Sequence, residues 1–537
     1  MTNNDGAAPA AARRADVASF FARIENILGK NRISTDMAAR RLYSTDFSEI
    51  ELSTAIAVIR PRTTQDVSSI IRAAAETGVA LTARGGGMSY TLGYVPRDEN
   101  TAVLDMTDMK AIRIRADDRL IEIEPGATWA QVHEALRPTG LRIGCMGTMS
   151  GIAATVGGGL GNNATGHGRG DITDDLMGLE AVLGDGSVIL TGALATNPQH
   201  PVLRSYGPDL TGVFTHDAGV FGIKTKAVFR LQPKPGGVAF VCYGFSDSRK
   251  LVRALCEVEK LDVMASNMAF SHYHHRLFAS LKPAADEAKL VGREVMQSAR
   301  SKLRALSSLA ALARPGGFKY LLKWPFSTFG VIDAYDQATA DKMARDAGAV
   351  MRRHGGIKLP SSLGVAFRAQ PYMPIERLMI GVDGECTIPT NCGVVLSQSE
   401  ALLNAVEGFF SENEAAMSAH GVTWTRLFLT SKGGFGMEPI LYWNDRPSAL
   451  RMAQLSPERR AEFESKPENK NSRDFALDLR RRLVERVDAL HPYHFQIGKY
   501  YDYRSALQSD AAWQTLVSFK DILDPAGLMN PGGLGLR

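Results

Sequence analysis

Glycine-rich segments are the parts of this sequence best suited to chemistry, and the first of them reads ARGGGMS over residues 83–89. Gly85, Gly86 and Gly87 carry no Cβ, so their backbone N–H groups can converge on an anion. Arg84 and Ser89 flank them and add a positive charge and a hydroxyl. The spacing matches neither a P-loop nor the glycine-rich turn that opens a Rossmann helix. The segment therefore predicts a phosphate cradle of another kind.

A second glycine cluster, SGIAATVGGGLGNNATGHGRGD, covers residues 150–171 and shows no strong helix or strand signal. One glycine loop alone is more often a tight turn than a ligand site, because short motifs match by chance. Two separated loops in one domain favour an extended ligand of dinucleotide size.

The elements around these loops predict one α+β domain from about residue 50 to 235. A β-branched strand, a helix beginning near Thr64 and a second strand ending at Arg84 form a βαβ unit. Asp185 and Gly186 suit a hairpin turn that demands positive φ between two β-rich runs. After residue 235 longer helical segments, with strands at 393–398 and 424–430, predict a second domain.

Composition narrows the class of protein. The chain has 537 residues, more than one hydrophobic core usually organises, with 45% hydrophobic and 22% charged residues. No apolar run is long enough for a membrane span, and no export signal follows Arg13 and Arg14. Five scattered cysteines argue against a disulfide framework and favour the cytoplasm. Nothing indicates a nucleic-acid partner.

Four blocks, in order, resemble the flavoproteins with a vanillyl-alcohol oxidase (PCMH-type) FAD-binding domain. They lie at residues 60–90, 123–188, 207–237 and 522–535. The resemblance implies an α+β fold with a two-part FAD-binding domain over 50–235 and an α+β cap over 236–495. A helical segment would occupy 1–49, and residues 496–537 would return to the FAD domain. The resemblance assigns FAD to Arg84, Gly85, Gly86, Gly87, Met88, Ser89, Gly151, Thr155, Gly158, Asn162, Gly166, Gly222 and Ile223.

The resemblance also bears on how the flavin is held. Many members attach it through a histidine in the first loop or a cysteine before the second, and here Met88 and Ala153 stand at those places. We therefore expect non-covalent FAD. Cys145 lies close enough in sequence to keep a cysteinyl link open. We expect no metal.

Within the family, the branch acting on para-hydroxybenzyl compounds looks closest. By that resemblance Asp171 is an acid beside the flavin, Tyr90 binds the phenol, and Tyr503 and Arg504 form a second phenol-binding pair. Two tyrosines and an arginine would stabilise a phenolate, from which benzylic hydride leaves readily to flavin N5. Asp171 would then serve as base or counter-charge.

Each of these residues also has a structural interpretation. Asp171 suits a cap or turn, Tyr90 suits packing, and Tyr503 with Arg504 suits a surface pair at a helix start. We interpret the HYHH run at 272–275 as surface rather than metal-binding, because no spaced second pair accompanies it. His491 and His494 are further candidates for the pocket wall.

Two other functions stay open. An FAD-dependent D-2-hydroxy-acid dehydrogenase of the glycolate or D-lactate type would use Arg504 to clamp a carboxylate, although its metal-binding histidine block is missing here. A non-catalytic flavin-binding module is the third option. A homodimer is one option for the assembly.

The electron acceptor could be oxygen, a quinone or a cytochrome, and residues 295–332 bear on this choice. This segment holds six cations and no acid, with leucines at helical spacing and aromatics after Pro315. Such a composition is typical of a segment lying on an anionic membrane. The competing interpretation is a cap helix packed on its own domain. A peripheral contact with the inner membrane face is therefore a hypothesis for this segment.

Overall fold

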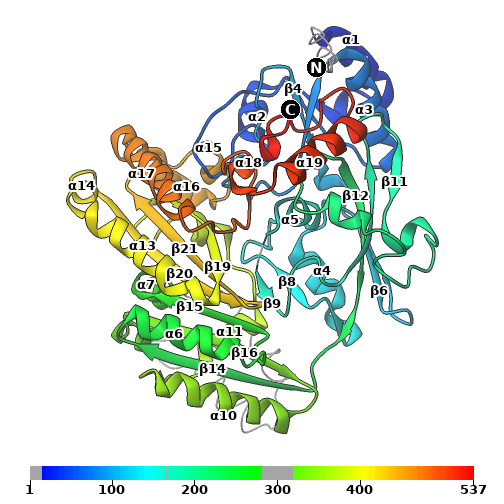
Figure 1. Cartoon of the computed structure of the whole chain (residues 1–537). Helices are drawn as coiled ribbons and strands as arrows, with labels where there is room; N and C mark the ends of the chain where they lie inside the picture. The colour runs from blue at the N-terminus through cyan, green and yellow to red at the C-terminus, as the bar shows by residue number, and fades with distance from the viewer. Residues whose placement is uncertain (1–14, 165, 281–317) are drawn as a thin grey trace, which may run out of the picture.

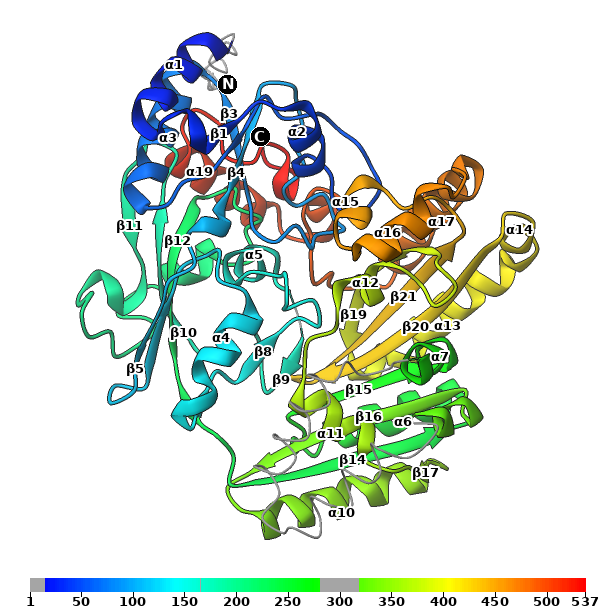
Figure 2. The ribbon, with the colours of Figure 1, turned by 180° about the vertical axis from the view of Figure 1, so that it is seen from behind.

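The computed structural model describes residues 15–164, 166–280 and 318–537, which form two halves (Figure 1). The glycine-loop half contains residues 15–235 together with the C-terminal 496–537. The cap contains residues 236–280 and 318–495 and is built around one large antiparallel sheet (Figure 2). This arrangement confirms the α+β class expected from the sequence.

The first sheet of the glycine-loop half confirms the βαβ prediction. Its strands β2, β4 and β3 are parallel, β1 is antiparallel at the edge, and Thr63 caps α3 through its hydroxyl. Because β3 ends at Arg84, the first glycine loop leaves the carboxyl edge of this sheet. The elements are α1 (Val17–Leu28), β1 (Ile33–Ser34), α2 (Met37–Tyr43), β2 (Val58–Ile59), α3 (Thr64–Thr77), β3 (Ala80–Arg84) and β4 (Thr101–Asp105).

The second sheet is antiparallel, with the order β11-β10-β12-β6-β5. The predicted hairpin joins β10 to β11, with Gly186 at φ 80° and Ser187 N donating to Asp185 Oδ1 at 2.8 Å. Outside this sheet, β7 pairs with β13 and β8 pairs with β9. The elements of this region are β5 (Ile112–Arg115), β6 (Leu120–Ile123), α4 (Trp129–Leu136), β7 (Leu141–Arg142), β8 (Cys145–Gly147), β9 (His167–Gly168), β10 (Leu176–Val182), β11 (Val188–Leu190), β12 (Ile223–Arg230) and β13 (Gln232–Pro233).

The second glycine cluster contains a helix that the sequence did not predict. Helix α5 (Val156–Asn162) begins after Thr155, whose hydroxyl accepts from Gly158 N. Its glycines allow close packing, because a Cβ at Gly157 would lie 2.6 Å from Pro125 and one at Gly159 2.7 Å from Ile172. Helix propensity is low here, and tertiary packing decides the conformation.

The cap sheet has the order β17-β14-β16-β15-β20-β21-β18, and β19 also pairs with β21. Along β14, Val241 and Tyr243 pack toward α6, α10, α13 and α17, whereas Cys242 packs toward α7 and α11. This alternation buries both faces of the sheet. The strands are β14 (Gly237–Phe245), β15 (Ser266–Ser271), β16 (Phe326–Ala334), β17 (Ile357–Lys358), β18 (Cys386–Pro389), β19 (Cys392–Val395), β20 (Val422–Ser431) and β21 (Gly434–Trp443). The helices are α6 (Ser248–Glu259), α7 (His272–Ser280), α10 (Gln337–Arg353), α11 (Ser362–Ala369), α12 (Ile375–Met379), α13 (Ser399–Glu412), α14 (Glu414–Ala419), α15 (Ala449–Ala453), α16 (Pro457–Glu464) and α17 (Lys470–Asp488).

Two interpretations of the cap sequence need correction. His274 and His275 are buried, not on the surface, and burial lowers the pKa of His275 to about 4. The aromatics of the basic segment also pack inward, since Phe326 begins the central strand β16 and Tyr320 and Trp324 pack on the cap core. The cations Arg300, Lys302, Arg304 and Arg314 lie outside the described residues. Within the described ranges, no helix is long and apolar enough to cross a membrane.

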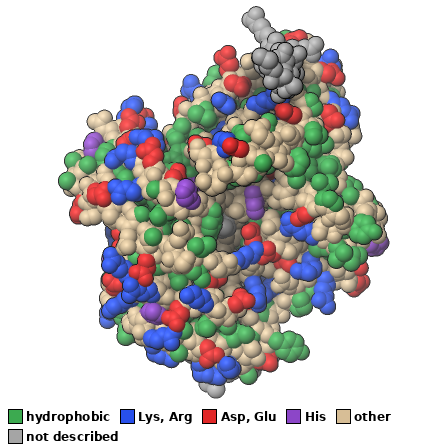
Figure 3. Space-filling model, viewed as in Figure 1, with side chains coloured by type: hydrophobic (Ala, Val, Ile, Leu, Met, Phe, Trp, Pro, Cys, Tyr) green, Lys and Arg blue, Asp and Glu red, His purple; other side chains and the backbone are tan. Residues whose placement is uncertain are grey.

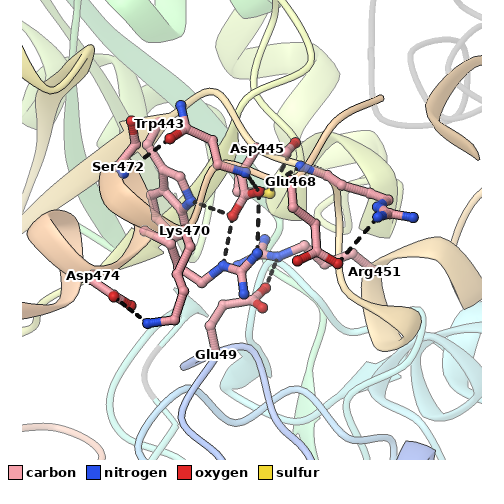
Figure 4. Close-up of polar contacts among 12 residues, drawn as sticks. Glu49, Trp443, Asp445, Arg451, Glu468, Lys470, Ser472 and Asp474 are labelled. Carbon is pink, nitrogen blue, oxygen red and sulfur yellow. Dashed lines mark hydrogen bonds and ion pairs between the residues drawn. The ribbon is translucent and has the colours of Figure 1, made fainter. Parts of the chain in front are cut away.

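The chain returns to the glycine-loop half through α18 (Tyr503–Ala506) and α19 (Asp510–Leu523). Buried Lys520 donates to Val220 O at 2.9 Å and pairs with Asp524 at 2.6 Å. A second joint, shown in Figure 4, ties the N-terminal segment to the cap, where fully buried Arg451 meets Glu49 at 2.5 Å. Asp445 lies beside it and accepts from Arg473 Nε at 2.6 Å. The buried pair of Arg451 and Glu49 therefore joins the two halves, in addition to apolar packing.

Candidate flavin site

Three segments far apart in the sequence line one narrow cavity of about 120 Å³. The first glycine loop, the 148–164 segment with α5, and the stretch 218–224 provide most of its wall. Of the thirteen residues expected to bind FAD, eleven line this cavity: Arg84, Gly85, Gly86, Gly87, Met88, Ser89, Thr155, Gly158, Asn162, Gly222 and Ile223. We call this cavity the cradle.

The glycines of the first loop are required by its close approach to the second. A Cβ at Gly86 would lie 1.7 Å from the carbonyl oxygen of Ala153, and one at Gly85 would lie 2.1 Å from Thr155 Oγ1. Gly87 has φ 75°, a conformation that other residues adopt only with strain. The two loops meet only because these Cβ atoms are missing, and that contact forms the narrow cradle.

Arg84 gives the cradle its positive charge. Its side chain is 7% exposed, with the guanidinium carbon 4.2 Å from the centre of the Tyr43 ring and 5.2 Å from that of Tyr94. The Nε atom has no hydrogen-bond partner among the described residues. A buried cation with an unused donor beside open glycine backbone suits a pyrophosphate, so the residues present fit FAD.

The first loop is held in place from behind. Buried Asp46 accepts from Ser89 Oγ at 2.9 Å and from Leu92 N at 2.7 Å. Asn530 donates to Gly93 O at 2.9 Å and accepts from Thr82 Oγ1 at 3.0 Å. Ser89 therefore acts through loop geometry as well as by lining the cradle.

Sequence reasoning missed several parts of this site. Lys224 lines the cradle and forms a buried pair with Asp217 at 2.6 Å, and Gln496, at the start of the C-terminal segment, also lines it. Asn530 lies within the C-terminal block that resembled the family, which was the available signal for its role. Nothing in the local sequence around Gln496 indicated that it would reach the cradle.

Gly151 and Gly166 do not line the cradle. A Cβ at Gly151 would lie 2.3 Å from the Tyr372 ring, and one at Gly166 would lie 1.6 Å from Gly147 O. Tyr372 belongs to the cap and donates to Met146 O at 2.7 Å. These two glycines are therefore explained by close packing, and Gly166 in addition lines the cleft described next.

A large cleft of about 1580 Å³ lies between the two halves, and Figure 3 shows the hollow. Asn163 and Gly166, which follow cradle residues in the sequence, line this cleft together with Phe495. Asp171 lines the same cleft, and its backbone N–H donates to Asp174 Oδ2 at 2.9 Å. We call this space the interdomain cleft.

The other three expected catalytic residues do not meet there. Tyr90 is buried, and its hydroxyl donates to Glu438 Oε1 at 3.0 Å. Tyr503 lines a separate side cavity together with His494, whose two ring nitrogens already contact Asn391 O and Asp488. Arg504 pairs with Asp510, and its side chain is 41% exposed. The three side chains therefore do not form one group in this structure, and Arg504 lies at the surface.

Cys145 lies on the cleft wall but is 3% exposed. Burial raises the pKa of its thiol to about 12, which keeps it protonated. A protonated thiol is a poor nucleophile, so Cys145 is chemically quiet in this environment.

Comparison with known proteins agrees with this geometry. Residues 55–192 match the family model described as FAD binding domain. The glycolate oxidase subunit GlcD of Bacillus subtilis is 28% identical over 212 residues, 39% of this chain and 44% of that protein. A D-lactate dehydrogenase of Archaeoglobus fulgidus is also 28% identical, over 38% of this chain and 44% of its own length. The chain thus matches less than half the length of these relatives.

Solved structures match over nearly the whole chain. A 4-ethylphenol oxidase from Gulosibacter chungangensis superposes with a TM-score of 0.68 at 17% identity, covering 99% of this chain and 98% of that one. A p-cresol methylhydroxylase gives a TM-score of 0.70 at 16% identity, with 97% of both chains covered. Residues 55–192 therefore match an FAD-binding domain, and the whole chain shares its fold with these two structures.

Proposed function

We propose that this protein is an FAD-dependent oxidoreductase whose substrate reacts in the interdomain cleft. The observation that carries this is the convergence of three glycine-containing segments on one cradle that adjoins the cleft at Asn162 and Asn163. Arg84 and the glycine loop would hold the pyrophosphate, and Ile223 and Lys224 also line the cradle. When bound, FAD supplies a hydride acceptor to the site.

We propose further that the substrate is a para-substituted phenol oxidised at its benzylic carbon. A small recess beside the cleft supports this, because it is lined by Met146, Met268, Phe270, Phe329 and Phe367. The Phe270 and Phe367 rings are stacked with centroids 5.8 Å apart. The recess itself is only about 30 Å³, so it would supply an apolar face against which a ring in the cleft packs. Two enzymes of the same fold are named for ethylphenol and p-cresol, which agrees with this choice.

In this proposal Asp171 is the group that takes the phenol proton. It is the one expected catalytic residue on the cleft wall, near Gly168, which lines both the cleft and the recess. Tyr90, Tyr503 and Arg504 have no part in this proton transfer. Tyr90 is hydrogen-bonded to Glu438, Tyr503 lines another cavity, and Arg504 pairs with Asp510.

A 2-hydroxy acid is the second candidate substrate. The relatives matched by sequence are named for glycolate and D-lactate, and cations such as Arg142 and Lys432 lie on the cleft wall. Both cations already pair with carboxylates, Arg142 with Asp333 and Lys432 with Asp174. This occupation is why the phenol is preferred.

Anaerobic reduction of the bound flavin separates the candidates. We expect 4-hydroxybenzyl alcohol to bleach the yellow protein, and Asp171→Asn to slow bleaching by about tenfold or more while FAD stays bound. Bleaching by D-lactate or glycolate instead would favour the second candidate. If none of these compounds reduces the flavin, the oxidoreductase proposal gives way to a flavin-binding module.

A further inference from the structure

Tyr493 is a residue of the interdomain cleft that the sequence analysis did not single out. It lies near the end of the cap, shortly after α17, and it lines the cleft with 46% of its surface exposed. Tyr90 and Tyr503, the two tyrosines expected to bind substrate, do not line that cleft. The cleft therefore presents an accessible tyrosine other than the two expected.

The ring of Tyr493 lies on bare backbone contributed by two glycines. A Cβ added at Gly393 of β19 would lie 2.3 Å from Cζ and 2.7 Å from both Cε atoms, which places it over the face of the ring. A Cβ added at Gly434, the first residue of β21, would lie 2.8 Å from the hydroxyl oxygen. Packing of an aromatic ring over a glycine is a recognised arrangement in β-sheets. The covered face belongs to these strands, and the exposed part of the ring borders the cleft.

Backbone contacts hold this ring in place. Tyr493 N donates to Gly393 O, and Gly393 N donates to Tyr493 O, each at 2.9 Å. Phe495 N donates to the side-chain oxygen of Asn391 at 2.8 Å. The Phe495 ring also lines the cleft, with its centre 5.2 Å from that of Tyr493. A ring held in this way loses little conformational entropy when a ligand packs on it, so Tyr493 is preorganised for such a contact.

Tyr493 lies close to the site of the proposed reaction. Gln496, three residues further along, lines the cradle, and three residues span at most about 11 Å. Asp171 lines the same cleft as Tyr493. The pKa of Tyr493 is raised by burial first, then by Cys392 and by the charge of Asp171. The exposed ring is therefore near both the cradle and the group proposed to take the phenol proton.

We infer that Tyr493 is the surface on which the aromatic ring of the substrate packs. Contact between two aromatic rings adds to affinity beyond the area that it buries, and a saturated ring of similar size does not gain this term. Tyr493 thus makes the cleft selective for flat aromatic rings, and it acts through its own ring rather than through its hydroxyl. This inference deepens the proposed function and rests on it for the chemical class of the substrate.

Calorimetric titration of the FAD-loaded protein with phenol and with cyclohexanol tests the inference. The two probes share the ring size and the hydroxyl, and neither has a benzylic carbon, so turnover does not interfere. We expect phenol to bind at least about fivefold more tightly than cyclohexanol. Tyr493→Leu should reduce that preference to within about twofold. Tyr493→Phe keeps the ring and should retain the preference.

Tyr335→Leu is the matched control, because Tyr335 also lines the cleft but is 93% exposed. A side chain so exposed lacks the covered face that fixes Tyr493, so this variant should keep the preference for phenol. Thermal unfolding and the FAD-to-protein ratio verify that each variant is folded and loaded.

A crystal structure of the FAD-loaded wild-type protein with phenol is a second measurement that needs no variant. We expect the centre of the phenol ring within about 7 Å of the centre of the Tyr493 ring. A phenol ring bound elsewhere, no binding of either probe, equal binding of the two, or a preference that survives Tyr493→Leu would overturn the inference. Loss of the preference in Tyr493→Phe would assign the contact to the hydroxyl and overturn it as well.

These outcomes are distinct from a failure of the proposed function. A preference that depends on Tyr493, in a protein whose flavin no phenol bleaches, would retain the aromatic surface and reject only the oxidation. Bleaching by 4-hydroxybenzyl alcohol, together with a preference independent of Tyr493, would retain the oxidation and reject this residue.

Discussion

The Tyr90 hydroxyl donates a hydrogen bond of 3.0 Å to Glu438 Oε1, so the residue that follows the first glycine loop is fixed by the cap. Arg480 donates to the Tyr90 carbonyl at 2.9 Å and strengthens the same attachment. A residue expected to bind substrate instead connects the cofactor loop with the cap sheet. Changes at Glu438 should therefore affect stability before they affect chemistry.

Burial raises the pKa of Glu438 above its ordinary 4.5. Because the folded state holds this proton more tightly than the unfolded state, the group's stabilising contribution is complete below pH 4.5 and is lost as pH rises through the folded pKa. Glu438→Gln cannot ionise, so we expect it to remove this loss in denaturant titrations across pH. Glu412→Gln is the control of opposite sign, because a hydrogen bond from Arg486 lowers the pKa of Glu412. Identical pH profiles for wild type and Glu438→Gln would contradict the assignment.

Gly86→Ala should destabilise the protein by about 2 kcal/mol or more and release FAD, since the new Cβ would lie 1.7 Å from Ala153 O. Gly408→Ala is the matched control, because Gly408 lies in helix α13 with nothing within 4 Å of the added methyl. There alanine should stabilise by about 0.5–1 kcal/mol. Thermal unfolding and the FAD-to-protein ratio after desalting measure both effects. Retention of stoichiometric FAD by Gly86→Ala would refute the close-packing argument.

Arg504→Ala should leave flavin reduction within about twofold of wild type and change stability by at most about 1 kcal/mol, because exposed ion pairs contribute little. Its partner Asp510 has a side chain that is 85% exposed. Stopped-flow bleaching with a reactive substrate is the measurement, and Arg84→Ala, which should lose FAD, is the contrasting variant. A tenfold slower reduction in Arg504→Ala would return Arg504 to the active site.

Arg451→Met should cost about 3–5 kcal/mol of stability, because Glu49 would be left as a charged group that is 9% exposed without its partner. The carbonyl of Thr387, which accepts from Arg451 at 2.7 Å, would also lose its donor. Arg486→Met removes an exposed pair with Glu412 and should cost at most about 1 kcal/mol. Urea unfolding measures both free energies of unfolding. Equal decreases in the two variants would show that the buried Arg451–Glu49 pair stabilises the fold no more than an exposed pair does.

FAD should separate from the protein on acid precipitation, leaving a chain whose intact mass equals that of the sequence. Met88 offers no nucleophile on the cradle wall, and the Cys145 thiol stays protonated because burial raises its pKa to about 12. Mass spectrometry of the denatured protein decides the matter. Cys145→Ser should bind FAD equally, and a chain heavier by one flavin would disprove the non-covalent assignment.

The strands and helices around β3 and the hairpin at Asp185 were predictable because local signals, β-branched runs, a Thr63 cap and an Asp-Gly turn, agree with the tertiary structure. Helix α5 was not, since its glycines give a weak local preference and only packing on Pro125 and Ile172 makes them helical. The cradle residues followed from motif order. The partners of Tyr90 and Arg504 could not be predicted, because their hydrogen bonds to Glu438 and Asp510 depend on three-dimensional placement that no motif encodes.

Thr82 and Asn530 are separated by 448 positions, and the bond between them helps to form the cradle. During synthesis the cap strands and helices, residues 236–495, emerge before Asn530 exists. The contacts within the cap are closer in sequence, so this inserted unit can fold early, whereas the glycine-loop half must wait for its final segment. Flavin capture is consequently a late event in biogenesis, and the nascent chain passes through a stage with a folded cap and an unfinished cofactor site.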